Sequence, residues 1–212
     1  MADSRTTVFP TIDQATKYWI KGYGFTLAKL LNSKPLAHDF DGGSIAIARL
    51  APQDYHRWHS PVDGVVESIT EVPGTYYTVN PQAINEVSLD SLPSPQRSLM
   101  ACTQPGSLNV FCQNRRSVMI IKRANTNSRV AVIAVGAMLV GSIVYNPGIA
   151  VGSQVSRAQC LGKFQYGGST VITLYQKGDA DMDADLVKNS TEQNCETLVR
   201  VGERIGRGPK NA

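Results

Sequence analysis

The sequence predicts an α+β protein: a β-rich single domain of antiparallel sheets with short helices near both ends. Three observations predict it. The 212 residues, 42% of them hydrophobic, are enough for one domain with a substantial core. Short apolar runs separated by turn residues fill the middle of the chain, as is typical of antiparallel strands. Helical patterns are found toward the two ends.

The first elements follow from periodicity and turn signals. Residues 11–31 combine helical spacing with glycine breaks and predict one or two short helices. The run SIAIARL at 44–50 alternates as a strand does. Residues 61–80 are expected to form short strands, with turns at Asp63-Gly64 and Pro73-Gly74.

The second half of the chain is predicted to be mainly strands. Residues 88–107 hold three prolines and several serines and are expected to form a surface loop. Strands then follow at NVFC, SVMIIKR, the apolar run at 130–145 and STVITLY. The 130–145 run is interrupted by glycines and is shorter than the roughly 20 residues of a membrane-spanning helix, so we interpret it as buried strands. Ser190 and Gln193 form a capping-box pattern that predicts a helix over 191–206.

Composition favours some partners and locations over others. The net charge of +4 is mildly basic, and no basic run carries interleaved aromatics, so no nucleic-acid partner is predicted. A weak peripheral contact with an anionic membrane is consistent with this charge. The four cysteines lack CxxC spacing and are interpreted as reduced thiols of a reducing compartment. No signal peptide begins the sequence, so we expect a location in the cytoplasm or at the periphery of an internal membrane.

Two patterns resemble metal-binding motifs, and each lacks a residue that its motif requires. Of the three histidines, His38, His56 and His59, the last two share the phrase RLAPQDYHRWHSPVDG. That phrase is rich in strand and turn residues and has no HExxH pattern, so a packed or hydrogen-bonded pair is favoured over a metal site. DADMDAD at 179–185 spaces its acids as a calcium loop does, but Leu186 stands where such a loop requires glycine. We predict a solvated acidic turn and no bound metal.

The stretch YGGSTVITLY at 166–175 places two glycines and Ser169 directly before a predicted strand. Paired glycines mark a sharp bend or a close approach of the backbone. The stretch lacks the final glycine of a GxSxG nucleophile elbow. Asp3, His59 and Ser169 supply an acid, a base and a nucleophile, so that imidazole can take the serine proton. On spacing alone, a chain of this length offers many such sets.

A series of longer phrases makes the signal specific. ADSRTTVFPTID, WIKGYGFTLAKLL, RLAPQDYHRWHSPVDG, VNPQAI, VGAMLVGSI and LGKFQYGGSTVI follow one another in the order and spacing of the phosphatidylserine decarboxylase family. The sequence resembles this family from Ala2 to about Gly206. GGST resembles the form in the Golgi- or endosome-type eukaryotic branch and in related bacterial and fungal members. Each fragment is weak alone, and together they are very specific.

The resemblance implies a precursor that cuts its own backbone. Members of the family are made as one inactive chain and cleave themselves at a Gly-Ser bond, here Gly168-Ser169. The whole chain, 1–212, would then be one decarboxylase-like domain made of a β chain, 1–168, and an α chain, 169–212. The paired glycines are explained if a carbonyl must be presented to the neighbouring serine in a distorted turn.

The resemblance also implies the residues that act. Asp3 and His59 complete a charge-relay triad with Ser169, whose oxygen attacks the Gly168 carbonyl. Later elimination converts Ser169 into a covalent pyruvoyl group, which forms a Schiff base with the substrate amine and takes up electrons as CO2 leaves. His56 is the expected proton source for the decarboxylation.

The sequence departs from the family pattern at two places. Family members usually carry a further segment ahead of the acid motif, commonly with proline before Ala-Asp, where this sequence has Met1. Near Ala158 and Gln159 the family more often has a glycine and an acidic residue. The second departure is expected to alter the pocket or the maturation rate without touching the triad.

Several functions stay open at this point. The leading one is conversion of phosphatidylserine to phosphatidylethanolamine by a homodimer of cleaved protomers in peripheral contact with a membrane. The alternatives are decarboxylation of a free aromatic amino acid and a non-catalytic, truncated family member that does not mature. An ordinary serine hydrolase is disfavoured because the nucleophile elbow is missing.

Overall fold

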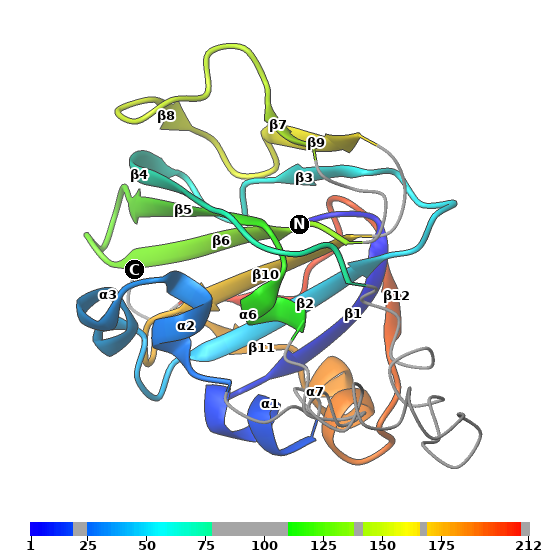
Figure 1. The fold of residues 1–212 in the computed structure, drawn as a ribbon. Helices are drawn as coiled ribbons and strands as arrows, with labels where there is room; N and C mark the ends of the chain where they lie inside the picture. Colours follow the sequence, from blue (N-terminus) through cyan, green and yellow to red (C-terminus); the bar gives the residue numbers. More distant parts are fainter. Residues whose placement is uncertain (19–24, 78–109, 138–141, 166–168, 209–212) are drawn as a thin grey trace, which may run out of the picture.

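The computed structural model describes residues 1–18, 25–77, 110–137, 142–165 and 169–208 (Figure 1). The loop expected at 88–107, and Gly168, lie outside these residues. The helices are α1 (Ile12–Tyr18), α2 (Leu27–Leu31), α3 (Lys34–Asp39), α6 (Val110–Gln113) and α7 (Ala184–Thr191). The strands are β1 (Ser4–Phe9), β2 (Ser44–Leu50), β3 (Arg57–His59), β4 (Gly64–Val72), β5 (Arg116–Arg123), β6 (Arg129–Val135), β7 (Ser142–Tyr145), β8 (Gln154–Val155), β9 (Cys160–Gln165), β10 (Ser169–Tyr175), β11 (Asp181–Met182), β12 (Thr197–Val199) and β13 (Gly206–Arg207).

An eight-stranded antiparallel sheet forms the centre of the protein, with the order β12-β1-β2-β10-β6-β5-β4-β8. Strand β10 pairs with β2 on one side and with β6 on the other along nearly its whole length. A smaller antiparallel sheet, β3-β9-β7, covers part of one face, and β11 pairs with β13. The predicted α+β class with antiparallel sheets and short helices is confirmed.

The two faces of the large sheet follow from side-chain alternation in β10. Val171 and Tyr175 contribute to one apolar core, whereas Ile172 and Leu174 contribute to the other. All seven residues of β10 are buried. A strand that is buried on both faces reads as a nearly continuous apolar run, which is the pattern of STVITLY.

Short helices cover one of these faces. Helices α2 and α3 lie on this side of the sheet (Figure 1), and Leu30, Leu31 and Phe40 belong to the same apolar core as Ile172 and Leu174 of β10. Thr26 caps α2, because its hydroxyl accepts a hydrogen bond from the Lys29 backbone N–H, and Ser33 caps α3 in the same way. The short helices predicted within 11–31 are therefore confirmed, as α1 and α2.

The small sheet covers the other face through an aromatic cluster. Trp58 of β3 is buried, with its ring centroid 4.7 Å from that of Phe164 and 5.9 Å from that of Tyr145. Gly162 lies under this ring, and a Cβ there would sit 2.5 Å from the indole. The close packing of β9 on Trp58 therefore requires glycine at this position.

Two predicted elements are wrong. The helix predicted over 191–206 is replaced by the end of α7, the strand β12 and turns, with Asn194 at a φ of 50°. Ser190 lies inside α7, where its hydroxyl accepts from the Val8 N–H and donates to the Leu186 carbonyl. The strand predicted for NVFC is wrong in its described part, because Val110–Cys112 lie in α6, where tertiary contacts override the β-propensity of apolar residues; Asn109 lies outside the described residues.

The acidic segment is less exposed than expected. Asp179 is buried, accepts a hydrogen bond from the Ser128 hydroxyl at 2.6 Å and pairs with Arg123 at 3.2 Å. Asp183 pairs with Arg204 at 2.9 Å. The prediction of a solvated turn is therefore wrong for Asp179, because Arg123 from a distant segment compensates its charge.

Among the described residues, Cys112, Cys160 and Cys195 form no disulfide. Within the described ranges, no helix combines the length and the hydrophobicity that crossing a bilayer requires.

Candidate active site

Ser169 is the first residue of the central strand β10. Its side chain is fully buried, and its Oγ has no hydrogen-bond partner among the described residues. Alternation places Ser169 on the same face of the sheet as Val171, Thr173 and Tyr175. Burying a hydroxyl without a partner costs about 1–3 kcal/mol. Within the described ranges Thr7 and Thr170 also bury unpartnered hydroxyls, so Ser169 is singled out by its position after Gly-Gly together with this burial.

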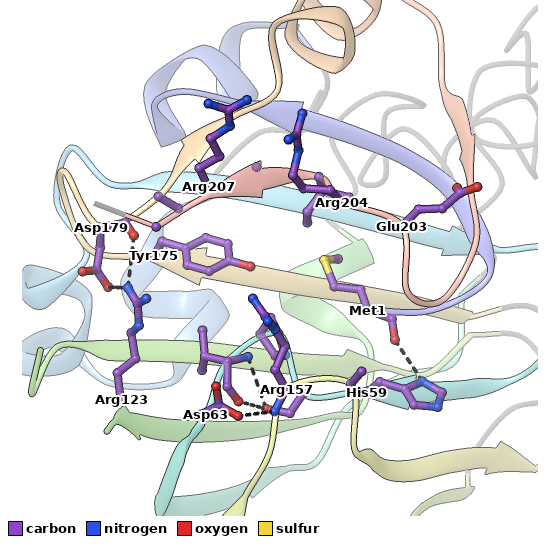
Figure 2. A pocket seen from close by; sticks show the side chains of 18 of the residues that line it. Met1, His59, Asp63, Arg123, Arg157, Tyr175, Asp179, Glu203, Arg204 and Arg207 are labelled. Carbon is purple, nitrogen blue, oxygen red and sulfur yellow. Dashed lines mark hydrogen bonds and ion pairs between the residues drawn. The ribbon is translucent and has the colours of Figure 1, made fainter. Parts of the chain in front are cut away.

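His59 ends β3 and is held by the backbone of the N-terminal segment. The carbonyl of Met1 accepts two hydrogen bonds from it, from the backbone N–H at 2.7 Å and from Nδ1 at 3.3 Å, the second of which is drawn in Figure 2. Because a carbonyl only accepts, Nδ1 carries the proton and Nε2 keeps its lone pair. The ring of Tyr55 stacks on the imidazole, with the centroids 6.2 Å apart.

Burial lowers the pKa of His59, while its hydrogen bond to Met1 and the charge of Asp3 act in the opposite direction. The neutral imidazole is therefore favoured at neutral pH, with Nε2 as the basic atom. Asp3 itself is half-buried at the edge of the sheet, and its Oδ1 accepts a hydrogen bond from the Val201 N–H at 2.7 Å. Asp3 thus acts on His59 through its charge.

His56 lies just before β3 and is oriented by a different carbonyl. Its Nε2 donates to the Pro52 carbonyl at 3.1 Å, which leaves the lone pair on Nδ1. Nδ1 is buried and has no partner among the described residues. The backbone carbonyl of His56 accepts from the Phe164 N–H at 2.9 Å, which fixes His56 beside β9.

Strand register relates the two histidines to the predicted cleavage site. His59 is paired with Cys160 at the start of β9, whereas His56 contacts Phe164 near its end. Strand β9 ends at Gln165 and β10 begins at Ser169, so His56 lies toward the end of β9 that leads to the cleavage site. In the described residues no hydrogen bond joins Asp3, His59 and Ser169. In uncomplexed enzymes, catalytic hydrogen bonds often tighten only during the reaction.

A cavity of about 500 Å³ adjoins His59 and Met1 (Figure 2). Among the described residues, four arginines and three carboxylates line it: Arg123, Arg157, Arg204, Arg207, Asp63, Asp179 and Glu203. Tyr175 also lines it, and burial raises the pKa of this phenol to about 12, so the phenol stays neutral. Tyr175 is six residues from Ser169, or about 20 Å along an extended strand, so this end of the cavity is remote from Ser169.

The turn that precedes β9 supports the segment after His59. The Ser60 N–H donates to the Gln159 carbonyl and the Ala158 N–H donates to the Ser60 carbonyl, both at 2.8 Å. Gln159 closes the turn by accepting from the Ser156 N–H through Oε1. Ala158 has a φ of 67°, in the left-handed region that a Cβ disfavours. The position where the family more often has glycine is therefore strained by alanine.

We expect Ala158→Gly to raise the free energy of unfolding by about 1 kcal/mol, because glycine adopts this conformation without the Cβ penalty. Urea unfolding followed by circular dichroism measures the change. Ala150→Gly is the matched control, since Ala150 is exposed and has a negative φ, and there we expect a loss of stability. Equal losses in both variants would show that Ala158 is unstrained.

The Met1 carbonyl is the part of the site that the sequence did not indicate. It orients His59 through the backbone, and a backbone carbonyl has no side-chain identity that a motif could reveal. The free Nδ1 of His56 was likewise unpredictable, because it depends on where Nε2 finds its acceptor.

The model of the family described as phosphatidylserine decarboxylase matches residues 1–207. The chain belongs to the phosphatidylserine decarboxylase family. The predicted resemblance is thereby confirmed.

Individual relatives agree with this membership. The chain is 46% identical to phosphatidylserine decarboxylase proenzyme 3 of Schizosaccharomyces pombe, over 97% of the chain and 19% of that relative. It is 40% identical to proenzyme 2 of Oryza sativa subsp. japonica, over 99% of the chain and 30% of the relative. It is 33% identical to a proenzyme of Fusobacterium nucleatum, over 97% of the chain and 60% of the relative. The chain thus spans less than two thirds of the length of each of these decarboxylase proenzymes.

Proposed function

We propose that this chain is a self-cleaving, pyruvoyl-dependent decarboxylase that converts phosphatidylserine to phosphatidylethanolamine and CO2. The observation that carries the proposal is the buried Ser169 hydroxyl, which has no partner among the described residues and stands directly after Gly-Gly at the start of the central strand. In a family whose relatives are named proenzymes, a retained but unpartnered serine hydroxyl is explained as a nucleophile.

The first proposed reaction is cleavage of the backbone. Neutral His59 accepts the Ser169 hydroxyl proton at Nε2 as the serine oxygen attacks the carbonyl carbon of Gly168. The carbon–nitrogen bond breaks, the nitrogen of Ser169 takes up the proton, and an ester joins the two fragments. Loss of the α-proton of Ser169 then expels the Gly168 carboxylate. Addition of water and loss of ammonia leave the pyruvoyl group at position 169.

The charge of Asp3 supports this step. A carboxylate near His59 raises the pKa of the imidazole and stabilises the imidazolium that forms when the proton is taken. The Met1 carbonyl holds Nδ1–H and so presents Nε2 as the base. In a Ser-His-Asp triad one carboxylate both orients the imidazole and stabilises its positive charge. Here we propose that the Met1 carbonyl orients the ring and that the Asp3 carboxylate stabilises the charge.

The sheet explains why the two fragments would stay together after cleavage. The proposed α chain, 169–212, contains β10, which pairs with β2 and β6, and β12, which pairs with β1. These ladders and the buried side chains of β10 do not depend on the bond that is cut. We therefore propose a single domain, 1–212, made of two tightly associated chains.

The residues present fit a pyruvoyl group at position 169. The position is fully buried, and the serine oxygen there has no hydrogen bond to break within the described residues. When present, the group supplies a carbonyl that bonds the substrate amine and withdraws electrons from the bond to the carboxylate. His56 keeps a lone pair on Nδ1, and this buried atom is the one that would hold and deliver a proton.

The substrate and the assembly are also proposals. The names of the relatives favour phosphatidylserine over a free aromatic amino acid. Peripheral contact with a membrane follows from a lipid substrate. A homodimer of cleaved protomers is supported by the open edge of the sheet at β12, where Leu198 is 63% exposed.

We expect the purified chain to separate on a denaturing gel into two fragments, residues 1–168 and 169–212. Intact mass measurement should show the small fragment lighter by one ammonia than the plain hydrolysis product, because pyruvoyl has replaced serine. Edman sequencing of that fragment should give no signal, since pyruvoyl has no free amine. A single full-length species would instead favour a chain that does not mature, and a fragment beginning with serine would exclude the pyruvoyl chemistry.

A further inference from the structure

Asn114 is a fully buried amide between α6 and β5, and all of its hydrogen-bonding capacity is used. Its Oδ1 accepts from the Thr75 hydroxyl at 3.2 Å and from the Tyr77 N–H at 2.9 Å. Its Nδ2 donates to the Tyr77 carbonyl and to the Gly136 carbonyl, both at 2.8 Å. Because carbonyls only accept, these partners fix the orientation of the amide. The side chain therefore links residues 75–77 to the end of β6.

The amide fills a gap in the ladder between β5 and β6. The Gly136 N–H donates to the Arg115 carbonyl at 2.9 Å, as in an antiparallel pair. The Arg115 N–H, which would return a bond to the Gly136 carbonyl in an unbroken ladder, donates instead to the Thr75 carbonyl at 2.9 Å. Nδ2 of Asn114 replaces that missing donor. The Asn114 side chain thus completes the hydrogen bonding of Gly136, the residue directly after β6.

Gly136 lies beside the start of β10. Val135, the last residue of β6, is paired with Thr170, and the next position in the same register sets Gly136 opposite Ser169. The backbone N–H and C=O of Gly136 form hydrogen bonds on the β5 side of the strand. Because these groups alternate in direction from one residue to the next, the N–H and C=O of Val135 point to the other side, toward Thr170 of β10. The Asn114 amide therefore holds the strand that aligns the residue after the proposed nucleophile.

We propose that Asn114 is a positioning residue for backbone cleavage before Ser169, an inference that rests on the proposed self-cleavage. Attack on a neighbouring carbonyl requires the reacting atoms to be held in one geometry, and a displacement of about 1 Å costs on the order of 100-fold in rate. Aspartate in place of Asn114 would turn two donors into acceptors that face the carbonyls of Tyr77 and Gly136. That repulsion would release the end of β6 while leaving the shape of the side chain unchanged.

The test compares Asn114→Asp with Ser190→Ala, a matched control. Ser190 is equally buried and hydrogen-bonded, and it lies in α7, away from the β6–β10 pair. Each precursor is refolded from urea, and the appearance of the fragment 169–212 is timed on the folded fraction. We expect Asn114→Asp to cut about 10–100-fold more slowly than wild type and Ser190→Ala to cut at the wild-type rate. Thr75→Val, which removes one of the four bonds, should be intermediate and serves if Asn114→Asp does not fold.

Hydrogen exchange supplies a second readout that a general loss of stability does not reproduce. The amides of Gly136 and Thr170 should lose protection in Asn114→Asp, or in Thr75→Val to a smaller degree, and keep it in Ser190→Ala. Wild-type cleavage rates in both the Asn114→Asp and Thr75→Val chains would overturn the inference and leave the proposed function standing. An uncut wild-type chain would overturn the proposed function and this inference together. The two failures are distinguishable on a gel, because the first gives fragments in every chain and the second gives only full-length wild-type chain.

Discussion

Replacing Ser169 with alanine is expected to leave the chain at full length, with a fold as stable as the wild-type precursor or more stable. The nucleophile is lost, so no ester forms and no fragment 169–212 appears on a denaturing gel. The removed hydroxyl is buried and has no partner among the described residues, so its loss relieves a cost of about 1–3 kcal/mol. Gel analysis and urea unfolding of the same preparation measure both effects.

Thr7→Val is the matched control for this experiment. Thr7 also has a buried hydroxyl without a described partner in the large sheet, and valine preserves its shape. The control should cut like wild type, which separates loss of a nucleophile from loss of a buried hydroxyl. Cleavage of the Ser169→Ala chain at the same bond would show that another group attacks. A marked loss of stability would mean that the Ser169 hydroxyl has a partner in the folded precursor.

Much of the fold was predictable because its strands are either alternating or uniformly apolar. The run that forms β2 alternates isoleucine with alanine, and the short run that forms β10 is rich in β-branched residues, so both indicate strands; in the structure both strands are almost wholly buried. The helix expected over 191–206 failed because the capping-box residues serve another purpose. Ser190 is used inside α7 to satisfy the Val8 N–H, a contact across 182 positions that local pattern cannot reveal.

The residues of the candidate site were predictable from the sequence, because their side-chain types and the phrases around them form recognisable motifs. Ser169, His59 and His56 were named because their phrases resemble a family. The orientation of both imidazoles was not predictable, because it depends on two backbone carbonyls, those of Met1 and Pro52. The role inferred for Asn114 was equally hidden, since it arises from a break in a ladder that only the folded chain displays.

The two histidines are presented differently, although they are only three residues apart. His59 donates through Nδ1 to Met1 and keeps its lone pair on Nε2. His56 donates through Nε2 to Pro52 and keeps its lone pair on Nδ1. Opposite atoms are therefore available for proton transfer, which supports the proposed separation of tasks between a single self-cleavage and repeated decarboxylation.

His56→Ala is expected to mature normally and to release CO2 about 10²–10⁴-fold more slowly, because a positioned acid typically contributes that much to a rate. The proposed base for cleavage, His59, remains in place, so the fragments 1–168 and 169–212 should form and the small one should carry the pyruvoyl mass. His59→Ala should stay uncut. Gel analysis, intact mass and CO2 release from phosphatidylserine vesicles are measured on the same preparations.

His38→Ala is the matched control, because the His38 side chain is 86% exposed and pairs only with the nearby Asp41 in the described structure. It should cut and turn over like wild type. If His56 merely packs beside β9, its loss will lower stability and leave turnover per folded molecule unchanged, which would remove it from the mechanism. If His56→Ala fails to cut, the position of His56 toward the end of β9 that leads to Ser169 would assign it to the cleavage itself. Slow CO2 release from a fully cut, pyruvoyl-bearing chain is the one result that places His56 in the decarboxylation alone.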